Sequence, residues 1–139
     1  MANALYNPFK DQLLSNATAI DLDSGGDTVK ATLIDSADYT FSAAHDEYSG
    51  GGTDVATAAK VAESSALTSP TTTNGTYDTA DFTWSSVSGD VSEAIILWDD
   101  TVTNDRLMAF YDTGMTGMPV TPNGGNINVT VNGSGWFSL

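Results

Sequence analysis

Three aspartates, Asp21, Asp23 and Asp27, lie within seven residues and surround the pair Gly25-Gly26. Carboxylates at this spacing are typical of calcium loops, but an EF-hand requires an oxygen ligand at its fifth position and a glutamate at its twelfth. Counting from Asp21, those positions hold Gly25 and Thr32. We therefore expect a glycine turn whose aspartates accept hydrogen bonds from the backbone. The three aspartates stay candidates for a looser cation site, with no bound metal expected.

His45 is the single histidine of the chain, so a three-histidine metal site is excluded and any catalytic triad would have to include this residue. The only Gly-Ser-Gly, at residues 133–135, lacks the G-x-S-x-G spacing of a nucleophile elbow. Carboxylates are too numerous for the sequence to select an acid and a nucleophile. We expect no catalytic residue, no cofactor and no enzymatic activity, with His45 on a solvent-exposed loop.

A second acidic group, Asp99, Asp100 and Asp105, falls within one predicted hairpin loop. These side chains could hold a cation, but exposed loops usually carry such charges for solubility. Solubility is the role that we expect for them.

The tryptophans suggest another class of function, because exposed indole rings can stack on sugars. Trp84, Trp98 and Trp136 would then belong to a carbohydrate-binding β-sandwich. Each of them lies in or next to an apolar strand pattern, however, and packing in the core is the role that the pattern favours.

The composition excludes several kinds of partner. Among 139 residues there are 18 acidic and 4 basic ones, no cysteine, and a net charge of −14. Phosphate backbones would be repelled by such a chain, so we expect no nucleic-acid partner. No apolar run approaches the roughly 20 residues that cross a bilayer, and no signal-peptide pattern opens the chain, so we expect no membrane partner.

A short helix is predicted near the N-terminus, because Leu5, Phe9 and Leu13 recur at a spacing of four. Asn7 would cap this helix, with Pro8 at its first position and residues 1–6 as an extended arm. We expect a protein without residues 1–14 to fold as a β domain that no longer binds its partner.

Strands are predicted for the rest of the chain. Residues 29–34 and 127–131 alternate with period two, and Asn74-Gly75 joins strands at 66–73 and 76–84 as a hairpin. Two further strands, 94–98 and 106–111, are apolar on both faces. Their sheet must be covered on both sides, which we expect from an opposite sheet and from the N-terminal helix. The stretch SGGGTD at 49–54 is expected to be a flexible loop.

These elements predict a mainly β fold, an antiparallel β-sandwich or barrel-like domain of about seven or eight strands with a short N-terminal helix or arm. Residues 1–26 form the arm and helix, which pack on the domain or on a neighbouring molecule. Residues 27–139 form the antiparallel β domain.

Three stretches carry a resemblance to a protein family: DTVKATLIDSADYTF at 27–41, the hairpin EAIILWDD…RLMAFYD, and GMPVTPNGGNINVTVNGSGWFSL at 117–139. Together they resemble small virion structural proteins of tailed bacteriophages. The resemblance implies a capsid decoration or cement protein that binds the major capsid protein on the outer capsid surface and stabilises the head. It also implies synthesis in the host cytoplasm and a homo-oligomer, with a trimer favoured.

Within the same class, a tail or neck component fits the sequence as well, and a carbohydrate-binding β-sandwich module is the alternative from a different class. For the partner interface we expect the apolar N-terminal segment and the methionine loop, whose flexible thioethers adapt to many surfaces. The residues concerned are Leu5, Tyr6, Phe9, Leu13, Met115 and Met118.

Overall fold

The computed structural model describes residues 3–16, 19–50 and 54–139. These residues form ten strands in antiparallel sheets, a short N-terminal α-helix and one turn of 3₁₀ helix. The predicted mainly β, antiparallel fold is therefore confirmed, and the described strands do not close into a barrel. Half of the predicted glycine loop 49–54, residues 51–53, lies outside the described residues.

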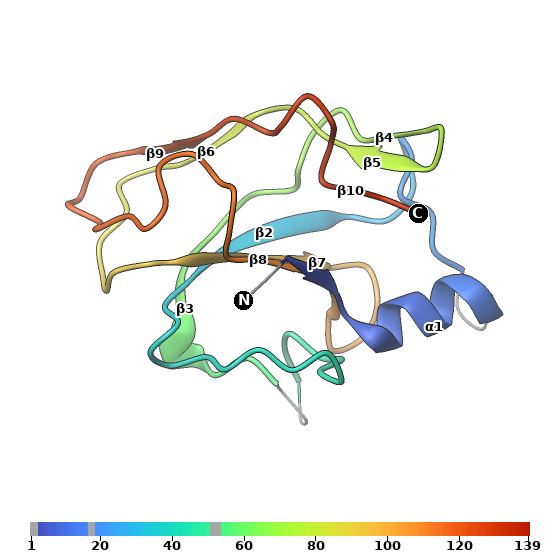
Figure 1. Ribbon diagram of the computed structural model, residues 1–139, viewed down its shortest axis with the longest axis horizontal. Helices are drawn as coiled ribbons and strands as arrows, with labels where there is room; N and C mark the ends of the chain where they lie inside the picture. The colour runs from blue at the N-terminus through green and yellow to red at the C-terminus, as the bar shows by residue number, and fades with distance from the viewer. Residues whose placement is uncertain (1–2, 17–18, 51–53) are drawn as a thin grey trace.

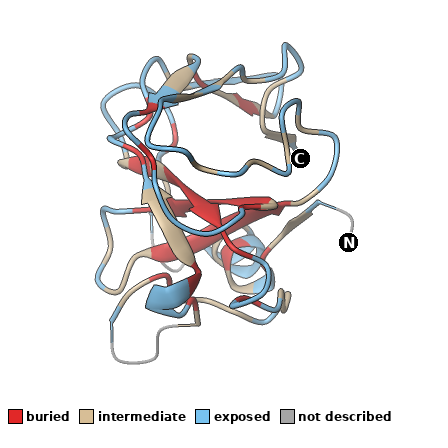
Figure 2. Ribbon diagram, turned by 90° about the vertical axis from the view of Figure 1, so that its left-hand side faces the viewer, coloured by how far each residue is buried: buried red, intermediate tan, exposed pale blue. Residues whose placement is uncertain are grey.

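The central sheet holds the core of the molecule. Its five strands run in the order β1 (Ala4–Leu5), β8 (Arg106–Tyr111), β7 (Ala94–Asp99), β2 (Val29–Ile34) and β3 (Lys60–Glu63). Every residue of β7 and β8 is buried, as their apolar pattern on both faces predicts. Figure 2 shows this buried sheet between two outer layers, in which exposed residues predominate.

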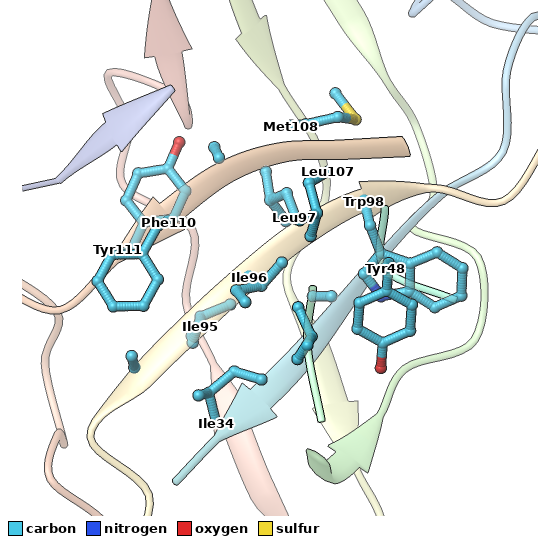
Figure 3. Packing of buried hydrophobic residues seen from close by; sticks show 14 of the residues in the cluster. Ile34, Tyr48, Ile95, Ile96, Leu97, Trp98, Leu107, Met108, Phe110 and Tyr111 are labelled. Atoms are coloured by element: carbon cyan, nitrogen blue, oxygen red, sulfur yellow. The ribbon is translucent and has the colours of Figure 1, made fainter. Parts of the chain in front are cut away.

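One face of the central sheet is covered by residues 35–50, which contain no helix. Tyr48 stacks on Trp98 with ring centroids 4.1 Å apart and ring planes 10° apart, as Figure 3 shows. Phe41 stacks on Phe110 at 4.9 Å. The helix was expected to cover this face, but a chain without regular secondary structure covers it through aromatic side chains.

Lysines extend the Tyr48–Trp98 stack. The Lys60 Nζ lies 3.7 Å from the centroid of the Tyr48 ring, and the Lys30 Nζ lies 5.2 Å from the Trp98 ring. Both are cation–π distances. The Thr32 hydroxyl links the two rings, because it accepts a hydrogen bond from Trp98 Nε1 (2.9 Å) and shares one with the Tyr48 hydroxyl (2.7 Å).

The other face is covered by two small sheets. One has the order β10 (Phe137–Ser138), β5 (Thr76–Asp78), β4 (Thr71–Thr73), and the other pairs β6 (Phe82–Trp84) with β9 (Ile127–Val129). Both lie above the central sheet in Figure 1. The Asn74-Gly75 hairpin is confirmed, with both residues at positive φ. The predicted strand 76–84 is instead two strands in different sheets, interrupted at residues 79–81.

The N-terminal segment is part of the domain core. β1 pairs with the edge of β8, and helix α1 (Asn7–Ser15) follows with Tyr6, not Asn7, at its cap position. Tyr6 and Phe9 have no exposed surface. The Phe9 ring meets Phe137 edge to face at 6.0 Å, so the helix packs against the C-terminal strand. A chain without residues 1–14 would lose these contacts, so we now expect the truncation to destabilise the β domain.

We predict that Phe9→Ala lowers the free energy of unfolding by about 3–5 kcal/mol, because it leaves a cavity beneath the helix. Urea unfolding followed by circular dichroism measures this. The control is Leu14→Ala in the same helix, whose side chain is 86% exposed and whose replacement should change stability by about 0.5 kcal/mol or less. Equal effects of the two substitutions would contradict the placement of the helix.

Candidate functional site

The aspartates of the Gly25-Gly26 turn accept backbone hydrogen bonds, as the sequence predicts. Asp27 Oδ2 accepts from the Asp21 N–H at 3.1 Å, and Asp21 Oδ1 accepts from the Asp23 N–H at 3.2 Å. Asp23 Oδ1 accepts from the Ser24 N–H at 2.7 Å. A Cβ on Gly26 would lie 2.1 Å from the Asp21 carbonyl oxygen, so only glycine fits there. Within the described residues, no group of three acids, histidines or cysteines is placed to hold a metal ion.

His45 is half-buried, and the expectation of a solvent-exposed loop histidine is wrong. Its Nδ1 lies 2.9 Å from the Tyr39 hydroxyl, which in turn lies 2.8 Å from the hydroxyl of Tyr6. The cause is the path of residues 35–50, which pack Tyr39 against Phe110 of the central sheet. This chain of hydroxyl groups satisfies buried polar atoms and ties the N-terminal segment to the covering layer.

The second acidic group is divided between core and surface. Asp99 is fully buried, where an exposed loop was expected, and its Oδ2 lies 3.4 Å from Arg106 Nη1 on the neighbouring strand. Burial raises the pKa of the Asp99 carboxyl, whereas the Thr101 N–H and Arg106 favour its charged form. Asp100 is exposed and pairs with Lys30 at 2.6 Å. Asp105 accepts a hydrogen bond from the Ser49 hydroxyl. These pairings give the acids structural roles.

The three tryptophans have different surroundings. Trp98 is in the core beside Tyr48, as expected. Trp84 is also buried, but it lines a groove, and its indole Nε1 has no hydrogen-bond partner. Trp136 is half-buried in the wall of the same groove, with its Nε1 donating to Thr79 Oγ1 at 2.8 Å.

A groove is the first of two surface features of the described residues on which we concentrate. It has a volume of about 870 Å³, within the range of roughly 300–1,000 Å³ that is usual for small-molecule sites. Its walls are residues 126–138, which include β9, and the loop 113–118. Ile95 and Tyr111 of the central sheet also line it. None of the described residues that line it is charged, although the chain carries a net charge of −14.

Asparagines in the groove wall are held in fixed orientations. Asn128 Oδ1 accepts from the Thr83 hydroxyl (2.8 Å), Asn126 Oδ1 from the Ser86 N–H (3.0 Å), and Asn132 Oδ1 from the Ser134 N–H (2.8 Å). Because each amide oxygen is engaged, each NH₂ group is left as a donor. Asn128 and Thr83 lie on the exposed face of the β6–β9 pair, whereas Trp84 and Ile127 lie on the other face, so the Asn128 amide is directed away from Trp84.

The second feature is an apolar surface at the end of the molecule where α1 and the C-terminus meet (Figure 1). A hollow of about 240 Å³ lies there, lined by side chains that include Leu13, Ile20, Phe137 and Leu139. Leu139 is 73% exposed, and Leu14, next to Leu13, is 86% exposed. We call this hollow, together with Leu14, the apolar end.

The residues predicted for the partner interface do not form one surface. Tyr6 and Phe9 are in the core, and Leu5 is half-buried in β1. Leu13 lines the hollow of the apolar end, whereas Met115 and Met118 line the groove. Sequence reasoning missed Leu14 and Leu139 as surface residues. Leu14 directly follows Leu13 in the predicted helix and falls outside the spacing of four that marks the buried face. This position is the signal that could have identified it as a surface residue.

Comparison with known proteins gives no family for this chain: no family model and no curated protein matches it. Helices able to span a membrane are likewise not found in the described part of the chain. The function must therefore be inferred from the groove, the apolar end and the charge of the surface.

All five tyrosines of the chain have raised pKa values, with burial as the main cause. Burial raises the pKa of Tyr39 to about 12, although its hydrogen bond with Tyr6 acts in the opposite direction. For Tyr48, burial and the hydrogen bond to Glu63 both raise the pKa. Each phenol thus keeps its proton in the folded state at a pH where the unfolded chain loses it.

We predict that the native protein shows little tyrosinate absorbance at pH values slightly above 10, the pKa of an unperturbed tyrosine, whereas in urea more than half of the tyrosines are ionised at the same pH. Because the folded state binds these protons more tightly, the free energy of unfolding should be unaffected below about pH 10 and fall as the pH rises above it. Spectrophotometric titration with and without urea measures both effects. Normal titration of several tyrosines in the native protein would contradict their burial.

Proposed function

We propose that the protein is a structural protein of a bacteriophage virion, a capsid decoration protein that binds the major capsid protein on the outer surface of the head. We infer further that the apolar end is the surface by which it attaches. The proposed role is adhesion, which stabilises the shell by adding contacts across its subunits and requires no catalysis.

The apolar end is the observation that carries this proposal. Single exposed leucines are common on protein surfaces, but Leu139 lines the apolar hollow, and Leu14 directly follows Leu13, which also lines it. Burying a leucine side chain stabilises a contact by about 1.5–3 kcal/mol. A protein partner that covers both leucines and fills the hollow would therefore gain substantial binding energy.

Charge supports the same surface and indicates the chemistry of the partner. The exposed acids Asp21 and Asp23 line the hollow beside its apolar residues. A matching capsid surface would present apolar side chains with lysine or arginine at the rim. Elsewhere, the net charge of −14 keeps decorated particles apart and repels DNA.

Attachment to a shell also favours an oligomer, and we propose a homotrimer. When one subunit of a trimer is bound, the others bind as if at high local concentration. Contacts that are weak in a single chain then suffice for stable attachment.

The proposal is tested by binding to heads purified from virions that lack this protein. The double variant Leu14→Gln, Leu139→Gln should bind at least about tenfold more weakly than the unmodified protein, since it removes two buried leucines from the contact. Glutamine is accepted well in a helix, so α1 should be retained. Cosedimentation with heads measures the affinity, and circular dichroism confirms the fold.

The matched control is Val91→Gln. Val91 is 42% exposed and belongs to the turn at residues 85–93, on the side of Figure 1 opposite α1. This variant should bind heads normally. Binding of the unmodified protein to isolated tails but not heads would instead favour a tail or neck component, and loss of binding in the control alone would place the contact on the other end.

A further inference from the structure

We propose that Asn74 is a site of self-modification, at which the side-chain amide is converted to a carboxylate without an enzyme. The reacting group is the backbone nitrogen of Gly75, and water is the co-reactant. Asn74 and Gly75 form the turn of the β4–β5 hairpin, and both residues are exposed. The reaction belongs to the isolated chain, so it does not depend on attachment to a head.

The conversion has two steps. In the first, the Gly75 nitrogen loses its proton to hydroxide and attacks the Asn74 Cγ. A C–N bond forms, the Cγ–Nδ2 bond breaks, and the amide nitrogen takes a proton from water and leaves as ammonia. In the second, water opens the resulting five-membered imide ring. Opening at the former side-chain carbonyl gives aspartate, whereas opening at the main-chain carbonyl gives isoaspartate, in which the main chain runs through the former side chain.

The surroundings of the Asn74-Gly75 pair permit the first step. Gly75 has no Cβ, so no side chain obstructs the close approach of its nitrogen to the Asn74 Cγ. The Gly75 N–H donates to no described residue, which leaves it accessible to hydroxide. Among the described residues, none is hydrogen-bonded to the Asn74 amide group either. The amide group can therefore rotate toward the nitrogen without breaking a hydrogen bond.

Asn123 is followed by a glycine as well, but its amide and the reacting nitrogen are both engaged. Its Oδ1 accepts a hydrogen bond from the Gly125 N–H at 3.0 Å. The Gly124 N–H, which would have to lose its proton, donates to the Val87 carbonyl oxygen at 2.7 Å. Both hydrogen bonds must open before this site can react.

Asn132 is the third asparagine that precedes a glycine, and it is held in a turn. Its Oδ1 accepts from the Ser134 N–H at 2.8 Å, and its carbonyl oxygen accepts from the Gly135 N–H at 2.7 Å. The sequence Asn-Gly is thus the same at three positions, whereas the hydrogen bonds around it differ. We infer that Asn74 is the position at which the native fold permits the reaction.

The product would change the border of the apolar end. Gly75 and Thr76 line its hollow, and the Gly75 carbonyl oxygen accepts a hydrogen bond from the Leu139 N–H at 3.0 Å. Aspartate adds a negative charge beside this surface. Isoaspartate also lengthens the main chain within a two-residue turn, and the register of a hairpin depends on the length of its turn.

Peptide mapping by mass spectrometry tests this inference. The full-length protein is incubated at mildly alkaline pH in water labelled with a heavy oxygen isotope. We expect aspartate and isoaspartate at position 74, each with one labelled oxygen. Conversion of Asn74 should be at least about fivefold faster than that of Asn123 or Asn132, because each hydrogen bond that must open slows the reaction by about this factor.

Two controls separate the effect of the fold from that of the sequence. In urea the hydrogen bonds of the native turns are lost, so the three asparagines should react at similar rates. In the folded variant Asn74→Gln an exposed amide is kept, but the additional methylene requires a six-membered ring, which closes much more slowly. This variant should stay unmodified at position 74, with unchanged rates at Asn123 and Asn132.

An unchanged Asn74 in the native protein would overturn the inference, whatever happens in urea. Equal rates at the three asparagines in the native protein would overturn it as well, because the hydrogen bonds would then have no protective effect. Since the incubation uses no virions, either result leaves the proposed attachment to heads to be judged by its own experiment.

Discussion

The need to cover both faces of the β7–β8 hairpin determines the rest of this structure. Ile96, Trp98 and Phe110 are directed to one face, and Ile95, Leu97 and Tyr111 to the other, and all of them are buried. A single additional layer would leave one of these sets in water, at a cost of about 1.5–3 kcal/mol for each large side chain. The chain supplies two different layers: aromatic residues from the irregular segment 35–50, and two small sheets.

The composition of the second layer also explains where the groove lies. The two small sheets are not paired with each other, and β6–β9 has only three residue pairs. Residues 113–118 and 126–138 surround the space beside this short sheet, where Ile95 and Tyr111 contribute to the lining. The apolar end is different, because it is formed by the junction of α1 with the C-terminal strand. The surface that we propose for adhesion and the groove share only Phe137 in their lining.

The sequence predicts the elements whose signals are local. Strands 29–34, 94–98 and 106–111 follow from residue patterns within six positions, and the Asn74-Gly75 turn follows from two residues that tolerate positive φ. The capping aspartates of residues 21–27 are local in the same way. β1 could not be predicted, since a two-residue strand has no periodicity and forms only because β8 offers an edge.

The predictions from sequence were wrong where the surroundings of a residue depend on parts of the chain that are distant in sequence. The burial of Asp99 depends on Arg106, which pairs with it across the hairpin, and that of His45 depends on Tyr39 and its packing on Phe110. The groove brings Trp84 together with residues 126–138, more than forty positions later, and no recognisable motif marks this stretch. Of the six residues predicted for the partner interface, Tyr6 and Phe9 are in the core, because an apolar residue that suits a partner surface suits burial in the chain's own fold equally well.

Cryo-electron microscopy of virions produced from the genome that encodes this chain tests the central claim most directly. Adhesion through the apolar end predicts density for the domain on the outer surface of the head, with Leu14 and Leu139 against the major capsid protein and the groove open to solvent. Virions without this density, or a domain bound to the shell through the groove, would contradict the proposed mode of attachment.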